Sequence, residues 1–428
     1  METRHKIHYR LWLFIIAALC FPLFQGITKI ITIKNLGGAV TLKSKPVWSA
    51  DNWFSGHFQD EALPYLNEQI GFYPDFIRIN NEVQYRLADI VNAKGVVVGK
   101  DHYLYEKNYI KAYTGTDFIG EEQVKEKVAL FQQFSDSVSL LGKQVLVILA
   151  PGKASYFPEF IPDEMDTITK LNANYEGYKA ELKESTVPFI DAHQWFRSMK
   201  DTSRYPLFPK CGIHWSKYGQ YLMLDSLSKY LNTINPGSAP RVVLDEVTWS
   251  NKNLYSDYDL GKGMNMLSQS PVFPMAYPKF HFELPLNSKK KAIVVADSYY
   301  WGLHSASISS TFFEEGEFWY YNKEIHYTNG KRKQFIDATT QVSDEIKDVD
   351  LFIFLSTDAN LYKFPFDFFK KLSQAKDLQL IRVIEKNIKR IKEDPKWLKF
   401  VAEKAKKKEI SLEEAIYLDA RYLALKNS

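Results

Sequence analysis

Ser298 and His214 are the two residues whose types and positions best suit covalent chemistry. Ser298 follows Asp297 at the end of an apolar run that begins at Ala292, and His214 stands where a helix is expected to begin. A serine hydroxyl is a weak nucleophile until a neighbouring base takes its proton. The oxyanion that then forms must be stabilised by preorganised donors. The two residues therefore predict acyl-group chemistry, as in a hydrolase or an acyltransferase.

Polar residues follow several other apolar runs of the chain. They are Pro151-Gly152-Lys153, Asp191-Ala192-His193 and Ser356-Thr357-Asp358-Ala359-Asn360. The carboxyl ends of parallel strands meet at one edge of an open sheet, where such sheets bind ligands. Asp and Ser also form turns readily, so a strand that simply ends in a turn accounts for Asp297-Ser298 as well. The chain has nine histidines, so a serine and a histidine can suggest a catalytic pair by chance. The residues alone therefore leave both the catalytic and the structural interpretation open.

The elements that would position these residues follow from hydrophobic periodicity. Residues 121–141 have the pattern of an amphipathic helix, and the run VLVILA after them is typical of a strand buried on both faces. Short strands are also expected in VPFIDA, over Ala292–Val295 and in LFIFLS, with a helix over Trp215–Leu231. Apolar runs that alternate with helices predict an α/β fold, a three-layer, flavodoxin-like sheet of mostly parallel strands.

The pattern divides the chain into three parts. Residues 1–30 form an anchor or signal segment, residues 31–380 form the α/β domain, and residues 381–428 form a small helical appendage. The lysines of the appendage are expected to make a solvated face. Within the domain, residues 235–288 are rich in proline and are predicted to be an irregular insertion or lid.

The amino terminus predicts a membrane anchor. The basic segment RHKIHYR precedes an uncharged apolar run from Leu11 to Phe24, which continues weakly through Ile27. Such a flank stays in the cytoplasm, and the run approaches the roughly 20 residues of a span if Lys29 extends to the interface. A cleaved signal peptide needs a small-x-small site, which FPLFQG does not offer. We therefore expect a single-pass protein of the inner membrane with its domain in the periplasm.

Composition excludes several classes of protein. A net charge of +4 on 428 residues, without a basic stripe interleaved with aromatics, gives no reason to expect nucleic acid as a partner. Two cysteines, Cys20 and Cys211, cannot build a disulfide framework or a cysteine-rich zinc site. We expect neither a metal nor a cofactor.

The chain from residue 54 to residue 361 resembles a known family. The blocks that carry the resemblance are Gly212-Ile213-His214-Trp215 and Ala296-Asp297-Ser298-Tyr299. They stand in the places of the Asp-x-His-Trp and Gly-Asp-Ser-Phe blocks of the extracytoplasmic SGNH-type O-acetyltransferases that serve alginate and related polysaccharides, in the DHHW-like branch. The block order is permuted relative to ordinary SGNH hydrolases. The blocks VVVGKDHYLY and APGKASYFPEFIP are similar to further family text.

The resemblance implies a role for each of these residues. Ser298 would be the nucleophile and His214 the general base, while Asp297, Asn360 and Asp358 would support the pair or the oxyanion. Contacts with substrate would come from Lys153, Tyr156 and Trp215. Two of these have structural alternatives, since Lys153 can cap a loop and Trp215 can pack under the histidine.

Glycine at position 212 is the serious departure from the family pattern. The family acid at that position orients the imidazole and stabilises its charged form, and spoiling such an acid costs on the order of 10⁴ in turnover in the serine-protease template. A backbone carbonyl, Asp191, Asp297 or Asp358 is expected to replace it. The chain can also be an inactive relative.

The resemblance implies O-acetylation of an envelope polysaccharide through an acyl-Ser298 intermediate. Acetyl-CoA is not expected outside the cytoplasm, so the implied partner is a membrane-bound O-acyltransferase that supplies the acetyl group. Two alternatives remain, a non-catalytic carbohydrate-binding or scaffold subunit of a polysaccharide assembly complex, and a carbohydrate esterase.

Overall fold

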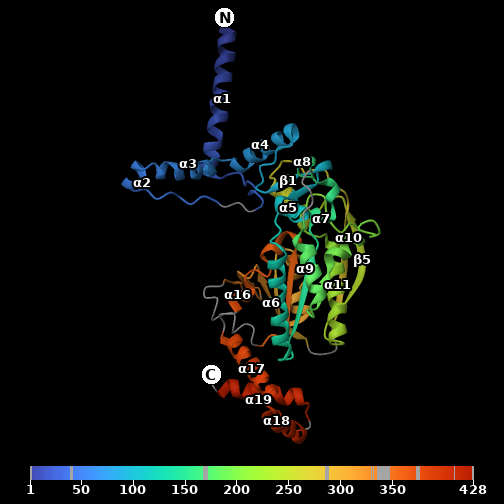
Figure 1. Cartoon of the computed structure of the whole chain (residues 1–428). Helices are drawn as coiled ribbons and strands as arrows, with labels where there is room; N and C mark the ends of the chain where they lie inside the picture. The colour runs from blue at the N-terminus through green and yellow to red at the C-terminus, as the bar shows by residue number, and fades with distance from the viewer. Residues whose placement is uncertain are drawn as a thin grey trace. The chain divides into compact units, whose positions relative to one another are not determined.

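The computed structural model describes residues 2–38, 42–166, 172–284, 289–328, 330, 332–334, 348–372, 376–408 and 410–426. The chain forms two compact units (Figure 1). The first contains residues 1–106, 210–213 and 258–273, and the second contains residues 107–209, 214–257 and 274–428.

A seven-stranded sheet forms the centre of the second unit, in the order β10-β9-β8-β7-β11-β3-β4. The strands are β3 (Gln144–Ala150), β4 (Phe189–Asp191), β7 (Lys290–Ala296), β8 (Phe313–Tyr320), β9 (Glu324–His326), β10 (Arg332–Gln334) and β11 (Leu351–Thr357). Strands β8, β7, β11, β3 and β4 run parallel, while β9 and β10 add an antiparallel edge. The mostly parallel α/β sheet expected from the sequence is confirmed.

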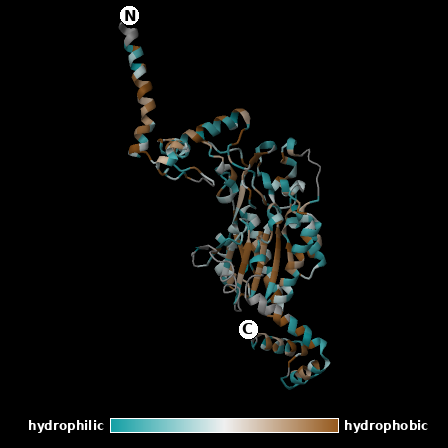
Figure 2. Cartoon of the chain, turned by 60° about the vertical axis from the view of Figure 1, so that its left-hand side comes forward, coloured by the Kyte–Doolittle hydropathy of each residue, from teal (hydrophilic) through white to brown (hydrophobic). Residues whose placement is uncertain are grey.

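Alternate residues of the central strands face an apolar layer of helices. Phe354 of β11 packs there against Phe131 of α6 (Glu121–Ser139), edge to face with ring centroids 5.0 Å apart. Helices α9 (Asn174–Glu184) and α16 (Phe368–Leu372) contribute to the same layer. The strand residues that point to the opposite face of the sheet are buried too. Both faces are therefore covered, which is why these strands have continuous apolar sequences. Figure 2 shows the brown strands enclosed by helices.

Further helices complete the second unit. They are α5 (Lys107–Thr114), α7 (Lys153–Tyr156), α8 (Asp163–Asp166), α10 (Ala192–Ser198), α11 (Lys217–Ile234), α13 (Tyr300–Ser305) and α14 (Ile308–Thr311), with 3-10 turns at Pro158–Phe160, Tyr255–Tyr258 and Asp358–Lys363. The helix expected from Trp215 begins at Lys217, because the Ser216 hydroxyl caps it by accepting the Gly219 N–H at 3.0 Å.

The segment expected to be irregular contains a long antiparallel ribbon. Strands β5 (Arg241–Ser250) and β6 (Met275–Glu283) pair along most of their length. The ribbon is hard to predict from the sequence. A bulge between Leu244 and Glu246 interrupts the alternation of apolar and polar residues, and a proline such as Pro278 usually argues against a strand. A two-stranded ribbon tolerates proline because its outer edge makes no ladder bonds. Tyr221 of α11 packs against Phe280 of β6, with ring centroids 5.6 Å apart.

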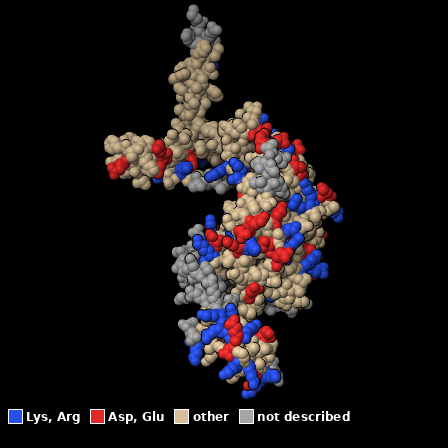
Figure 3. Space-filling model, viewed as in Figure 1, with Lys and Arg blue, Asp and Glu red and all other residues tan. Residues whose placement is uncertain are grey.

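Three helices end the chain and have a core of their own. They are α17 (Lys376–Glu393), α18 (Pro395–Lys408) and α19 (Leu412–Lys426). Their buried residues include Ile391, Val401, Ile416 and Ala420. Lys and Arg side chains cover much of the face seen in Figure 3, with acidic residues among them, which agrees with a solvated face.

The first unit begins with α1 (Glu2–Thr28), followed by α2 (Ala50–Phe54), α3 (His57–Gln69), α4 (Tyr73–Ala88), β1 (Val96–Val98), a 3-10 turn (Lys100–His102), β2 (Leu104–Glu106) and α12 (Asp259–Gly263). Residues 6–28 of α1 are long and apolar enough to cross a membrane, and they are the one such stretch in the described ranges. By length and composition this stretch fits the expected anchor, and a signal sequence passes the same test.

Candidate active site

Ser298 and His214 lie side by side in the second unit. Ser298 follows β7 at its carboxyl end, and its Oγ is 3.1 Å from Nε2 of His214, although 84 residues separate the two in sequence. Both side chains are half-buried. This is the separation that a serine nucleophile and its general base require.

Packing fixes the position of the histidine ring. The ring contacts Tyr299, with centroids 5.0 Å apart. Trp215 is fully buried between Tyr299 and Phe196, at centroid distances of 5.3 and 5.9 Å. Because Trp215 has no exposed surface in this structure, its ring is not accessible to a sugar.

Asp297 ties two strand ends together. It is fully buried, and its carboxylate accepts the Tyr299 N–H at 3.0 Å, the Thr357 N–H and hydroxyl at 2.8 Å each, and the Asn360 amide at 2.9 Å. Thr357 is the last residue of β11, so the carboxylate joins the ends of β7 and β11. Asp297 therefore supports the loop that carries Ser298.

Asn360 is occupied in the same network. Its amide N–H groups reach Asp297, the Thr357 hydroxyl at 3.2 Å and the Tyr321 hydroxyl at 3.4 Å. The expected role as an oxyanion donor thus competes with the bond to Asp297, and an amide has only two hydrogens to give.

Tyr321 is a candidate residue that the sequence prediction missed. It follows β8, and its hydroxyl accepts a hydrogen bond from the Asn360 amide at 3.4 Å and lies near the Ser298 side chain. Burial, and then the negative charge of Asp297, raise the pKa of the Tyr321 hydroxyl, so the group remains a proton donor. Its position at the end of the aromatic run EFWYY was the one signal in the sequence. The backbone turn that directs it toward Ser298 was not predictable.

The other expected residues gather around a second buried carboxylate, that of Asp358. Asp358 accepts hydrogen bonds from the Ser155 hydroxyl and the Ala359 N–H, and it lies 3.4 Å from Nε2 of the buried His193. Lys153 and Tyr156, which start and end the short helix α7, are almost fully buried as well. This cluster links the ends of β11, β3 and β4.

The three acids expected to replace the family acid have other partners. Asp297 and Asp358 hold the contacts just described. Asp191 caps α10 by accepting the Gln194 N–H at 2.8 Å, and it pairs with Lys179 at 3.3 Å. In the first unit, a different carboxylate reaches the segment that contains Gly212, because Asp259 accepts the Ile213 N–H at 2.9 Å.

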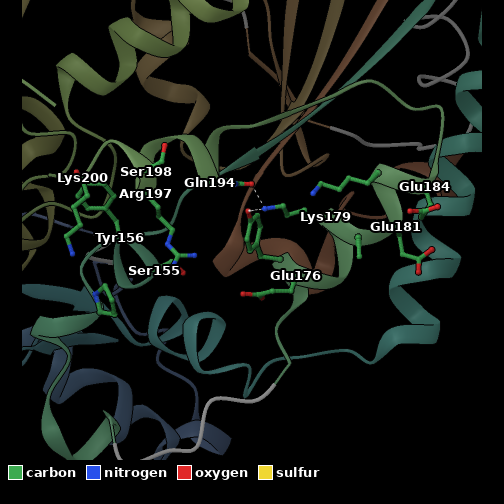
Figure 4. Close-up of a pocket in the computed structure, with 14 residues that line it drawn as sticks. Ser155, Tyr156, Glu176, Lys179, Glu181, Glu184, Gln194, Arg197, Ser198 and Lys200 are labelled. Atoms are coloured by element: carbon green, nitrogen blue, oxygen red, sulfur yellow. Dashed lines mark hydrogen bonds between the residues drawn. The ribbon is translucent and has the colours of Figure 1, made fainter. Parts of the chain in front are cut away.

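A pocket of about 900 Å³ lies beside this second cluster, between α7, α9 and α10 (Figure 4). Arg197 extends toward Ser155 in this view, and Lys179 hydrogen-bonds to Gln194 and Tyr175. The pocket lining does not include Ser298 or His214. Among the described residues, no group of three His, Cys, Asp or Glu side chains is placed to hold a metal ion.

Comparisons with known proteins match the middle of the chain. The family model of the SGNH hydrolase-like domain of acetyltransferase AlgX matches residues 96–251. The probable alginate O-acetylase AlgJ of Pseudomonas syringae pv. tomato is 25% identical over 126 residues, and that of Pseudomonas putida is 23% identical over 135 residues. These alignments cover 29% and 32% of this chain, and only 30% and 33% of the relatives.

Three solved structures are among those that the chain resembles. They are the O-acetyltransferase domain of Pseudomonas putida AlgJ (16% identity, 65% of this chain and 98% of that one, TM-score 0.40), Pseudomonas aeruginosa AlgX (11%, 67% and 68%, 0.40) and Bacillus cereus PatB1 (10%, 62% and 96%, 0.39). Because these TM-scores are below 0.5, the similarity to known proteins is judged from the sequence match alone. That match contains the His214 block and the strand ends at Lys153 and His193, so these parts of the chain are similar to the SGNH hydrolase-like domain of acetyltransferase AlgX.

Proposed function

We propose that this protein transfers acetyl groups to hydroxyls of a cell-envelope polysaccharide through an acyl-serine intermediate. The observation that carries the proposal is the 3.1 Å contact between Ser298 Oγ and His214 Nε2 at the carboxyl edge of a parallel sheet. The family match supports the acetyl group, and the names of the alginate O-acetylase relatives support a polysaccharide as the acceptor.

The first half-reaction loads the serine. His214 takes the proton of Ser298 while Oγ attacks the acetyl carbonyl carbon of the donor. The Tyr321 hydroxyl donates a hydrogen bond to the carbonyl oxygen as it becomes negative, and Asp297 and Asn360 hold the loop in place. When the tetrahedral intermediate collapses, the bond to the leaving group breaks and His214 returns the proton to that group. Acetyl-Ser298 remains.

The second half-reaction unloads the serine. A sugar hydroxyl gives its proton to His214 and attacks the acetyl carbon. The bond to Oγ then breaks, and the same proton restores the serine hydroxyl. Water in place of the sugar hydroxyl would release acetate and make the protein an esterase, so the acceptor that reaches His214 decides between the two activities.

The acetyl donor is proposed to come from a membrane-bound O-acyltransferase. Acetyl-CoA is not expected outside the cytoplasm, and α1 is suited to hold the protein in the inner membrane beside such a partner, with its sheet unit in the periplasm.

A non-catalytic scaffold is the second candidate, and Gly212 is the observation that favours it. Acyl labelling separates the two candidates. The full-length protein in detergent is incubated with a chromogenic acetyl ester, and intact-mass and peptide mass spectrometry locate any added acetyl group. We expect one acetyl on Ser298, none in Ser298→Ala, and wild-type labelling in the control Ser305→Ala, which removes an exposed serine of α13. A folded wild-type protein that stays unlabelled would favour the scaffold.

Adding a short oligosaccharide with free hydroxyls to the labelled protein then identifies the acceptor. Acetylated oligosaccharide is the expected product. Release of acetate at the same rate with and without the sugar would make the protein an esterase.

A further inference from the structure

Helices α2 and α3 of the first unit are rich in apolar residues, and none of their residues is buried. The exposed fractions of the large side chains in and beside them are 66% for Trp48, 47% for Trp53, 88% for Phe54, 64% for Leu63 and 58% for Leu66. Helices in proteins gain most of their stability from packing an apolar face. These two helices therefore need a cover that the described part of the chain does not supply.

The apolar residues of α3 lie on one side of the helix. Phe58, Ala62, Tyr65 and Leu66 follow the i, i+4, i+7, i+8 spacing of a single face. The opposite side carries polar residues, among them Asp60 and Asn67. On the apolar side Leu66 is exposed, while Phe58, Ala62 and Tyr65 are half-buried, and exposed Leu63 lies toward the polar side.

A tight contact fixes the end of α3 to α1. Gly71, in the turn between α3 and α4, donates its N–H to the Pro22 carbonyl at 2.9 Å, and the rings of Phe21 and Phe72 stack with centroids 5.3 Å apart. A Cβ on Gly71 would lie 2.4 Å from that carbonyl oxygen, and one on Gly26 would lie 2.6 Å from the Gln69 oxygen. Only glycine at both positions allows this approach.

The contact lies at a defined depth along α1. With a rise of about 1.5 Å per residue, Gly26 is about 3 Å and Phe21 about 10 Å before the end of the helix at Thr28. The apolar stretch from Lys6 to Thr28 is about 35 Å long on the same basis, against about 30 Å for the hydrocarbon core of a bilayer. If α1 spans the membrane, the turn after α3 therefore lies where acyl chains meet headgroups.

We infer that α2 and α3 lie in the outer interface of the same bilayer, with their apolar face toward the acyl chains. The inference rests on the proposed membrane anchor. Lipid is the cover because the same end of α1 exposes Phe24 and Ile27, and Figure 1 shows α3 leading away from that end of α1. Trp48 and Trp53 are the side chains that membranes hold at their interfaces.

The charge pattern adds a condition to the inference. The charged side chains of α3 apart from His57 are all acidic, namely Asp60, Glu61 and Glu68. Attraction to anionic lipid therefore does not drive the contact, and burial of apolar area does. The contact should form on zwitterionic lipid and should not weaken at high salt.

The test uses the full-length protein in phosphatidylcholine liposomes. In a Cys20→Ser, Cys211→Ala background, single cysteines replace Leu66 or Ala62 on the apolar face and Asp60 or Asn67 on the polar face, and each carries a nitroxide label. Collisions with oxygen, which enters lipid, and with a water-soluble nickel chelate are measured by electron paramagnetic resonance. We expect an oxygen-to-nickel collision ratio several-fold higher at positions 66 and 62 than at positions 60 and 67, unchanged in 1 M salt by the screening argument above.

Three results would overturn the inference. Nickel collisions that are equal on both faces would mean that α3 lies in water. Protection of position 66 from both probes would mean that protein covers the face, either a second copy or a partner. If alkaline carbonate extracted the whole protein from the liposomes, α1 would not be a membrane anchor, and the inference that rests on it would fail. Ester labelling of Ser298 on the same samples reports the proposed activity separately, so failure of one proposal is distinguishable from failure of the other.

Discussion

Tyr321 has a backbone conformation that aromatic residues rarely adopt. Its φ is 48°, in the left-handed region, and Asn322 beside it has a φ of 52°. Such strain persists where the surrounding structure enforces it, commonly at functional sites. Here it follows β8 and brings the Tyr321 hydroxyl to the Asn360 amide, near Ser298. The conformation is therefore part of the reason for assigning Tyr321 to the site.

Replacing Tyr321 by phenylalanine removes one hydroxyl and keeps the ring. If that hydroxyl stabilises the oxyanion, acylation of Ser298 should slow by about 10²–10³, the usual effect of losing one such donor. Stopped-flow measurement of the acylation burst gives the rate, and Tyr320→Phe is the matched control at the preceding residue. Equal losses in the two variants would assign Tyr321 a structural role only.

Gly212→Asp restores the acid of the family pattern. A catalytic imidazole must donate from its second nitrogen to some acceptor, and we expect this chain to have one. The substitution should then change the acylation rate by less than about tenfold, against the ~10⁴ at stake without an acceptor. A gain of several hundredfold would mean that His214 lacks support in the natural protein.

Asp117 gives the protein a pH-dependent stability. Burial, and then the negative charge of Asp358, raise the pKa of its carboxyl from 3.8 to about 6. Between these values the folded state binds more protons than the unfolded state, so this group makes the protein less stable as pH rises from about 4 to 6. Asp117→Asn should remove this loss and be more stable than wild type at pH 7, by on the order of 1 kcal/mol after solvent screening at a half-buried site.

Urea unfolding at pH 4 and pH 7 checks the Asp117 prediction. The variant keeps the side-chain oxygen that accepts the Asn174 amide. A stability difference between variant and wild type that is the same at both pH values would contradict the assignment.

At the scale of elements, the loop after β3 needs glycine at position 152, because there is no room there for a side chain. A Cβ on Gly152 would lie 1.9 Å from an Asp358 carboxylate oxygen, and that carboxylate is held by Ser155 and Ala359. Gly152→Ala should therefore lower the free energy of unfolding by about 1–3 kcal/mol.

Gly177→Ala is the matched control for Gly152→Ala. Gly177 lies inside α9, and a Cβ there would meet Val124 at an ordinary 3.4 Å. Alanine is favoured over glycine within a helix, so this variant should keep or gain stability, by up to about 1 kcal/mol. Urea midpoints that fall equally in both variants would contradict the packing argument.

The parallel strands were predictable because they are buried on both faces. The runs that became β3, β7 and β11 are almost continuously apolar, as a strand covered by helices on each side requires. The ribbon of β5 and β6 was not predictable, because it is half exposed and its bulge breaks the period of two.

The candidate site also has a part that the sequence could predict and a part that it could not. The pairing of Ser298 with His214 was expected from residue type and from the family resemblance, and strand order was not needed for it. The partners of Asp297 were not predictable, because they depend on β11 lying between β7 and β3, an order that comes from long-range pairing. Tyr321 was missed since its backbone turn has no local signature.

At the scale of the whole molecule, the final three helices have their own apolar core. A protein that ends at residue 375 should therefore keep the sheet unit folded and keep Ser298 reactive toward the acetyl ester. Labelling within about twofold of the full chain, with unchanged near-ultraviolet circular dichroism, is the expected result. The twofold margin corresponds to about 0.4 kcal/mol. Loss of labelling would mean that the helices support the site.

Because of the glycine contact between α1 and the turn after α3, folding of the first unit depends on how α1 is synthesised and retained. Ribosomes release α1 first, and the Pro22 carbonyl has no Gly71 amide to meet until α3 has followed it out of the translocon. If α1 is the proposed membrane anchor, the first unit closes only after this helix is inserted. A secretion system that cleaved the helix would deliver a unit with Phe72 and the Gly71 amide uncovered. For heterologous production, this argues for keeping the helix and purifying from membranes.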